Sequence, residues 1–241
     1  MLTVHELTGG YSRVQPVIHD LSFDVNPGEM VGLIGLNGAG KSTTIKHILG
    51  LMTPVAGKVT LHGKTLQDDP SAFRSQIAYI PETPQFYEEL TLWEHLELTI
   101  RAYRLDEAEA SRRAHELLEQ FRMSKAKHWF PHTFSKGMQQ KIMILCAFLA
   151  QPALLIVDEP FVGLDPLAIQ ALLDLLQEGK QQGMGILIST HILDMAEKYC
   201  DRFILLHDGR IRLKGDLPAM QHTLNKPGAS LEQLFIQVVK G

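Results

Sequence analysis

Residues 35–43 read Gly35-Leu36-Asn37-Gly38-Ala39-Gly40-Lys41-Ser42-Thr43 and fill the pattern G-x-x-x-x-G-K-[ST] without a mismatch. The segment 30–34 before them is short and apolar, which is typical of a buried strand. After them, apolar residues recur at helical spacing, at Ile45, Ile48, Leu49 and Met52. A glycine-rich loop between a strand and a helix aims its backbone N–H groups at an anion. The stretch therefore predicts a phosphate-binding loop, in which Lys41 contacts the β- and γ-phosphates and Ser42 holds Mg²⁺.

The composition is that of an ordinary globular protein. Its 241 residues suffice for one large α/β domain, and the net charge of −4 gives no argument for a nucleic-acid partner. Cys146 and Cys200 lie in separate apolar segments, so we expect neither a disulfide framework nor a cysteine metal site. Residues 1–5 carry no secretory signal, and the apolar run 142–150 is far shorter than the ~20 residues of a membrane span. We therefore expect a chain that does not cross a membrane.

Strand and helix patterns alternate along the chain. Strands are expected near 21–25, 30–34, 59–61, 77–80, 154–157, 185–189 and 203–206, and a hairpin turn at Asp208-Gly209. Helices are expected over 92–103, over 136–150, after a capping box of Asp106 with Glu109, and from Pro166 with Asp165 as N-cap. Alternating strands and helices predict an α/β fold with a mostly parallel sheet. We expect one domain over residues 1–241, with a helical insertion near 85–150 and a C-terminal tail near 217–241.

Two carboxylates follow the apolar run Leu154-Leu155-Ile156-Val157. Asp158 and Glu159 come at the carboxyl end of this expected strand, where open α/β sheets bind ligands. Asp158 is placed to hold Mg²⁺ through water, and Glu159 to polarise an attacking water as a general base. Alone, the pair could equally be two solvated carboxylates at a strand end. Beside a phosphate-binding loop, they predict nucleotide hydrolysis.

Four further motifs complete a resemblance to the ATP-binding-cassette (ABC) ATPases, the motor subunits of ABC transporters. Residues 134–140, Phe-Ser-Lys-Gly-Met-Gln-Gln, resemble the ABC signature, and 163–166, Gly-Leu-Asp-Pro, resemble the D-loop. His191, after the expected strand 185–189, resembles the switch histidine that contacts the γ-phosphate. Tyr11 resembles the aromatic residue that stacks on adenine, although it could also be an ordinary loop aromatic. The resemblance implies a P-loop fold of ABC type, with a mostly parallel core sheet, an antiparallel β part and a helical subdomain.

The resemblance also implies a site shared between two chains. The nucleotide, ATP with Mg²⁺, would lie on the P-loop of one chain and against the partner chain's signature and D-loop. On this sequence the residues contributed in trans would be Ser135, Lys136, Gly137, Met138 and Asp165. Locally, Ser135 is also an ordinary N-cap for the helix that follows it.

The sequence departs from the common family pattern at three positions. Lys136 replaces a glycine and Met138 a glutamine in the signature, but the backbone donors survive both changes. Glu82 stands where most members carry the Q-loop glutamine and is assigned to Mg²⁺ or its water, with Gln85 as a weaker candidate. These features resemble bacterial exporter-type ATPases that work with separate permeases, including the Ecs-type group. In the tail, Leu231, Leu234, Phe235 and Val238 share a helical face that we expect to dock on the domain.

The resulting hypothesis is an ATPase that drives a separate membrane permease, in the export direction, as a homodimer at the cytoplasmic side of the cell membrane. The segment 82–93, with its aromatics Phe86, Tyr87 and Trp93 and with Tyr103 nearby, is expected to form the groove for a permease helix. The alternative is that these aromatics close the core of the helical insertion. Rival functions are a soluble ABC ATPase of translation or DNA repair, a P-loop small-molecule kinase, and a regulatory subunit with a dead ATPase site.

Overall fold

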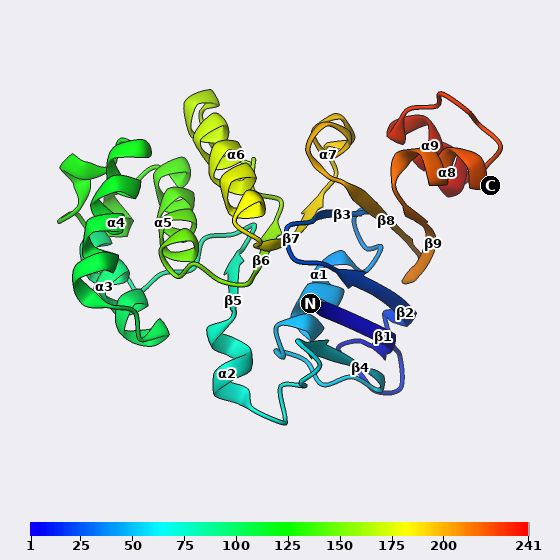
Figure 1. The fold of residues 1–241 in the computed structure, drawn as a ribbon, viewed down its shortest axis with the longest axis horizontal. Coiled ribbons are helices and arrows are strands. Elements are labelled where there is room, and N and C mark those ends of the chain that lie inside the picture. The colour runs from blue at the N-terminus through cyan, green and yellow to red at the C-terminus, as the bar shows by residue number, and fades with distance from the viewer. Residues whose placement is uncertain (241) are drawn as a thin grey trace.

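The computed structural model describes residues 1–240, and its strands form two sheets (Figure 1). The larger sheet has the order β5-β6-β7-β3-β8-β9. Its members are β5 (Ile77–Ile80), β6 (Leu154–Asp158), β7 (Gly185–Thr190), β3 (Met30–Ile34), β8 (Arg202–His207) and β9 (Arg210–Gly215). The first five run parallel and β9 pairs antiparallel with β8, so the mostly parallel sheet and the hairpin at 208–209 are confirmed. The carboxyl ends of β3, β6 and β7 consequently meet at one edge.

The smaller sheet is antiparallel and has the order β2-β1-β4. It consists of β1 (Leu2–Gly9), β2 (Ile18–Val25) and β4 (Ala56–Leu61). This is the antiparallel part that the family resemblance implied. Strand β1 was not predicted, because a register shift after Val4 and the left-handed backbone of Glu6, with φ 48°, break the alternation of its buried residues.

Helices cover both faces of the larger sheet, because alternate side chains of its strands point to opposite faces. On one face, Leu154 and Ile156 pack with α1 (Lys41–Ile48) and the smaller sheet. On the other, Leu155 and Val157 pack with a larger helical layer. This layer consists of α3 (Leu92–Tyr103), α4 (Glu107–Gln120), α5 (Lys136–Leu149) and α6 (Pro166–Gln181), with the 3₁₀ turns η1 (Ser124–Ala126) and η2 (Pro131–Thr133) nearby.

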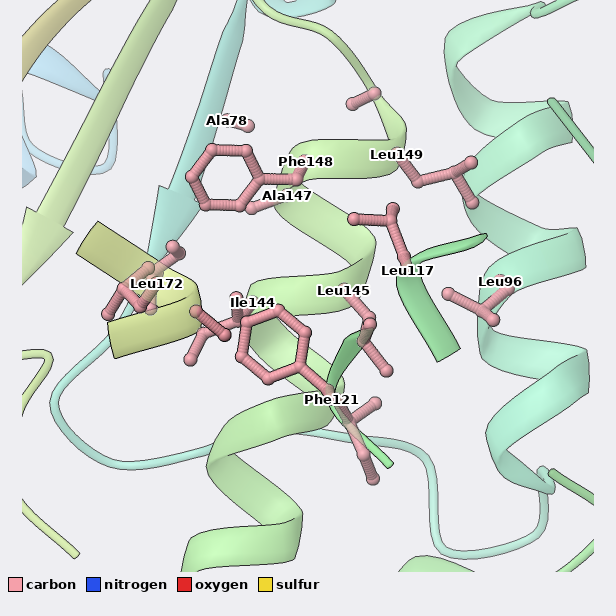
Figure 2. Packing of buried hydrophobic residues seen from close by; sticks show 14 of the residues in the cluster. Ala78, Leu96, Leu117, Phe121, Ile144, Leu145, Ala147, Phe148, Leu149 and Leu172 are labelled. Carbon is pink, nitrogen blue, oxygen red and sulfur yellow. The ribbon is translucent and has the colours of Figure 1, made fainter. Parts of the chain in front are cut away.

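Helix α5 forms the centre of the helical layer. Figure 2 shows Ile144, Leu145 and Phe148 of α5 among Leu96, Leu117, Phe121 and Leu172 from the surrounding helices and turns. The observed bounds of α3 agree with the prediction, and Thr91 and Glu94 form a capping box at its start. The capping box expected for α4 is only half formed. Asp106 accepts the Glu109 N–H, but the Glu109 carboxylate pairs with Arg113 instead.

The C-terminal tail packs on the domain, as predicted. Helices α8 (Leu217–Thr223) and α9 (Leu231–Lys240) lie beside α7 (Leu193–Tyr199) and β9 (Figure 1). Leu231 and Leu234 are fully buried there, and Phe235 and Val238 pack against the same cluster. The short helices α2 (Pro70–Ser75), α7 and α8 were not predicted from the sequence. Along residues 1–240, no helix combines the length and the apolar character that crossing a bilayer requires.

Candidate functional site

The glycine-rich loop connects β3 to α1, as its motif predicts. Gly40 has φ 106°, a left-handed conformation that favours glycine, and α1 begins at the next residue. The buried Lys41 donates from Nζ to the carbonyl oxygens of Gly35, at 2.8 Å, and Leu36, at 3.4 Å. The ammonium group therefore lies inside the curve of the loop, where a bound anion would meet it.

Asp158 ends β6 and is almost fully buried. Its carboxylate accepts hydrogen bonds from three hydroxyl groups: Ser42 Oγ at 3.4 Å, Tyr79 OH at 3.4 Å, and Ser189 Oγ. Burial, together with the Asp158 charge, raises the pKa of the Tyr79 phenol, which therefore keeps its proton and donates it. Sequence reasoning found Ser42 and Asp158 but neither Tyr79 nor Ser189.

Glu159 has a buried carboxylate and a left-handed backbone, with φ 47°. Its Oε2 accepts from His191 Nδ1 at 2.9 Å and from the His191 backbone N–H at 3.3 Å. Its Oε1 lies 4.0 Å from Lys41 Nζ. A strained non-glycine backbone held this way is common at functional sites. Because Nδ1 of His191 donates to the carboxylate, its Nε2 is left to face a ligand.

These groups surround one cavity of about 380 Å³. It is lined by Tyr11, Glu82, Asp158, Glu159, His191 and residues 36–38 and 40–43 of the loop, together with Val17, which was not predicted. Gly35 and Ala39, the other two residues of the expected loop set, do not line it. The cavity is large enough for a small-molecule ligand. The structure thus brings residues from five separate segments of the sequence to one place.

Tyr11 lies at the rim and is 71% exposed. Lys46, on α1, donates from Nζ to the Tyr11 hydroxyl at 3.1 Å and lies 5.1 Å from the ring centroid. The hydrogen bond from this cation lowers the pKa of the Tyr11 phenol. Sequence analysis did not identify Lys46 as a site residue, because no motif around it indicates that it contacts Tyr11.

The residues expected to act in trans lie outside this cavity. Ser135 caps α5 by accepting the Met138 N–H at 3.3 Å, and both Ser135 and Lys136 are exposed. Asp165 caps α6 and pairs with Lys141 at 3.0 Å. The Ala168 N–H and then Lys141 lower the pKa of Asp165.

The oxygen-donor set fits Mg²⁺. Mg²⁺ takes one or two carboxylates, with the remaining ligands supplied by water and phosphate. Asp158 and the Ser42 hydroxyl form such a partial set, and the exposed Glu82 lines the same cavity. Within residues 1–240 no cluster of three or more His, Cys, Asp or Glu residues could hold a metal alone.

A separate apolar groove of about 300 Å³ lies between α1, α2 and the end of α3. It is lined by Leu49, Leu51, Phe73, Arg74, Ile77, Tyr79 and Tyr103. Of the aromatics expected to line a docking groove, only Tyr103 does so here. Trp93 is partly buried, packs against the helical core and His115, and donates to Glu97 at 2.7 Å. Phe86 and Tyr87 pack around the His95 ring, although Tyr87 is 61% exposed.

Comparison with known proteins agrees with this geometry. Residues 18–162 match the family model described as ABC transporter. The chain is 55% identical over 240 residues to the ABC-type transporter ATP-binding protein EcsA of Bacillus subtilis (strain 168), covering 97% of that protein. It superposes with a TM-score of 0.96 on a solved ATP-binding subunit of an ABC transporter, at 55% identity and 99% coverage of each chain. With the dimeric ATP-binding cassette MJ0796 bound to ADP and Pi, the TM-score is 0.80 at 25% identity, over 90% of this chain and 99% of the other.

Proposed function

The chain belongs to the ABC transporter family, as an ATP-binding subunit with ATPase activity, and from this premise we propose that it works as a homodimer that drives a separate membrane permease. Each dimer would enclose two ATP molecules and close and open with hydrolysis. Export is the proposed direction, from the resemblance to exporter-type ATPases. The proposed location is the cytoplasmic side of the cell membrane, bound through the permease.

The arrangement of Glu159 is the observation that carries this proposal. Its carboxylate lies between His191, at 2.9 Å, and Lys41, at 4.0 Å, and faces the phosphate-binding loop. A carboxylate in this place can take a proton from a water that attacks the γ-phosphate. His191 would orient that water through its free Nε2, and in the doubly protonated imidazolium form Nε2 would also donate to the phosphate. Lys41 and the loop N–H groups would bind the β- and γ-phosphates.

Mg²⁺ is the cofactor that these residues suit. Ser42 and Asp158 would hold it, directly or through water, and Glu82 would contact its water from the cavity wall. When bound, Mg²⁺ neutralises charge on the phosphates during transfer. Tyr11 would stack on the adenine, which suits its exposed ring at the rim of the cavity.

A second copy of the chain would complete the site. Of the signature residues, Ser135 and Lys136 are exposed, and none of the signature lines its own cavity, so these two are available to another chain. Ser135 and the first N–H groups of α5 form an anion-binding helix N-terminus. The MJ0796 cassette, a dimer bound to ADP and Pi, supports a dimer for this chain as well. We propose that the helical insertion near 85–150 is the subdomain that carries the signature, and that 217–241 is the tail.

The apolar groove is the proposed contact with the permease. Its wall includes Leu51, which is 68% exposed, and the rings of Phe73, Tyr79 and Tyr103. Exposed apolar side chains beside aromatic ones are typical of interfaces that bind a helix of a partner. A charged side chain, Arg74, is also in the wall and could pair with an acidic group of the partner.

Site-specific crosslinking tests the proposal. Leu51→Cys, carrying a photo-crosslinker, should capture a protein with several membrane spans from membranes of the source cell. The control is Ile236→Cys, which is also exposed but lies on α9, far from the groove in sequence. Equal capture at both positions, or capture of ribosomal or DNA-repair components from Leu51 alone, would contradict the permease assignment.

A further inference from the structure

Tyr79 lies between the candidate metal carboxylate and the apolar groove. On β5 it pairs in register with Ile156 of β6, and Asp158 is two residues further along β6. Since side chains alternate along strands, Tyr79, Ile156 and Asp158 point to the same face of the sheet. The Tyr79 hydroxyl reaches Asp158 Oδ2 at 3.4 Å, while the ring forms part of the groove wall.

We propose that Tyr79 is a positioning residue that holds Asp158 for the metal and joins it to the groove. Hydroxyl groups that donate to a metal-binding carboxylate fix its orientation, and their loss typically costs 10–100-fold in metal affinity or activity. Ser189 holds the other carboxylate oxygen, Oδ1, so Tyr79 and Ser42 share Oδ2. This assignment rests on the proposed function, in which Asp158 binds Mg²⁺ and the groove binds a permease.

The position of the Tyr79 ring couples the groove to the carboxylate of Asp158. A helix that filled the groove would touch the ring of Tyr79 directly, and the same rigid side chain ends at the carboxylate. A shift of the ring would therefore move the hydroxyl relative to Asp158. The groove has another tyrosine, Tyr103, whose hydroxyl donates to the backbone oxygen of Ile77 at 2.7 Å instead. Tyr103 is thus a matched control for loss of a groove hydroxyl.

The test compares Tyr79→Phe with Tyr103→Phe in the full chain. Mn²⁺ replaces Mg²⁺ and is titrated with a non-hydrolysable ATP analogue, with bound metal followed by electron paramagnetic resonance. Tyr79→Phe should weaken Mn²⁺ binding by about 10-fold, and Tyr103→Phe should leave it unchanged. In an Asp158→Asn background, Tyr79→Phe should have no further effect, because the hydroxyl acts through that carboxylate.

A spectroscopic readout separates positioning from a general loss of stability. Metal binding should change the ultraviolet absorption of the Tyr79 phenol, and this difference signal should disappear in Tyr79→Phe but persist in Tyr103→Phe. In the crosslinked membrane complex, Tyr79→Phe should reduce stimulation of the ATPase by the permease more than Tyr103→Phe does.

Unchanged Mn²⁺ affinity in Tyr79→Phe, or equal losses in both variants, would overturn the positioning role while the proposed function stands. Failure of the unaltered chain to bind Mn²⁺ with nucleotide would overturn both. If the permease stimulates the ATPase equally in Tyr79→Phe and Tyr103→Phe, Tyr79 does not couple the groove to the metal site.

Discussion

Gly137 of the signature lies directly against Gly163 of the D-loop within one chain. A Cβ atom on Gly137 would lie 2.5 Å from the Gly163 carbonyl oxygen, which is closer than real Cβ contacts allow. A Cβ atom on Gly163 would instead lie 3.8 Å from the aliphatic carbons of the Lys136 side chain. The start of α5 and the loop before α6 therefore hold each other in place.

Gly137→Ala should displace this loop and lower both stability and ATPase activity. Forced overpacking of this kind costs about 1–3 kcal/mol in the free energy of unfolding. Thermal melting and steady-state ATP hydrolysis measure the two effects. Lys136→Ala, which adds no atom beside Gly163, should melt close to the unaltered chain. A Gly137→Ala chain that melts and hydrolyses normally would show that the contact is not tight in solution.

Glu159→Gln should retain ATP binding and slow hydrolysis by roughly 10²–10⁴, the usual contribution of a positioned base. Glutamine can still accept the His191 N–H but cannot take a proton from water. The variant should also accumulate as a nucleotide-bound dimer on size-exclusion chromatography. Near-normal turnover would remove Glu159 from the role of base.

Mixing Lys41→Ala chains with Gly137→Asp chains should restore ATPase activity. Each variant alone has one defect in every pocket of its homodimer. A mixed dimer instead combines the intact P-loop of the Gly137→Asp chain with the intact signature of the Lys41→Ala chain. Activity of the mixture should exceed that of either variant measured alone at the same total concentration. If the ATPase activity of the mixture is only the average of the activities of the two variants, the signature does not act in trans.

Lys46→Met should raise the pKa of the Tyr11 phenol. In the unaltered chain the ammonium group donates to the phenol oxygen at 3.1 Å and favours the phenolate, so Tyr11 loses its proton at lower pH than a free tyrosine. Removing that cation shifts the titration to higher pH. Ultraviolet titration measures it, and Tyr11→Phe identifies the signal among the five tyrosines. An identical titration in both chains would mean that Lys46 does not contact Tyr11 in solution.

Local signals in the sequence were enough to predict the elements that carry the site. Glycine spacing and a short apolar run predict the strand, loop and helix around Lys41. A second short apolar run predicts the strand that ends at Asp158. Helix α3 was predicted with the bounds that the structure has, and the structure shows a capping box at its start and Arg104 in a left-handed conformation at its end. Each of these signals lies within a few residues of the element that it predicts.

Features that depend on contacts between distant residues could not be predicted. Tyr79 and Asp158 are 79 residues apart, and only the register of β5 with β6 brings them together. Trp93 was expected at a docking surface, but α4 packs beside α3 and places His115 against its ring, at 4.7 Å between centroids. The partial burial of the Trp93 side chain therefore depends on how α3 and α4 pack together, and the sequence around Trp93 does not show this.

Glu197→Ala should loosen the C-terminal tail and, through it, the helix that follows His191. Glu197 lies on α7 and accepts the Leu231 N–H at 2.7 Å, where α9 begins. Loss of a carboxylate that caps a helix costs about 1 kcal/mol, which corresponds to a decrease of about 2–4 °C in melting temperature for a chain of this size. Because α7 begins two residues after His191, hydrogen exchange in 193–199 should become faster.

Two variants test the cause of that change. Glu197→Gln keeps an oxygen that can accept the Leu231 N–H, so it should recover most of the protection in α7. Gln237→Ala alters an exposed position of the same tail helix and should leave the exchange of α7 unchanged. If Glu197→Ala accelerates exchange in α9 but leaves α7 protected, the tail packs on α7 without bracing it. His191 would then be held by its two hydrogen bonds to Glu159 and not by the tail.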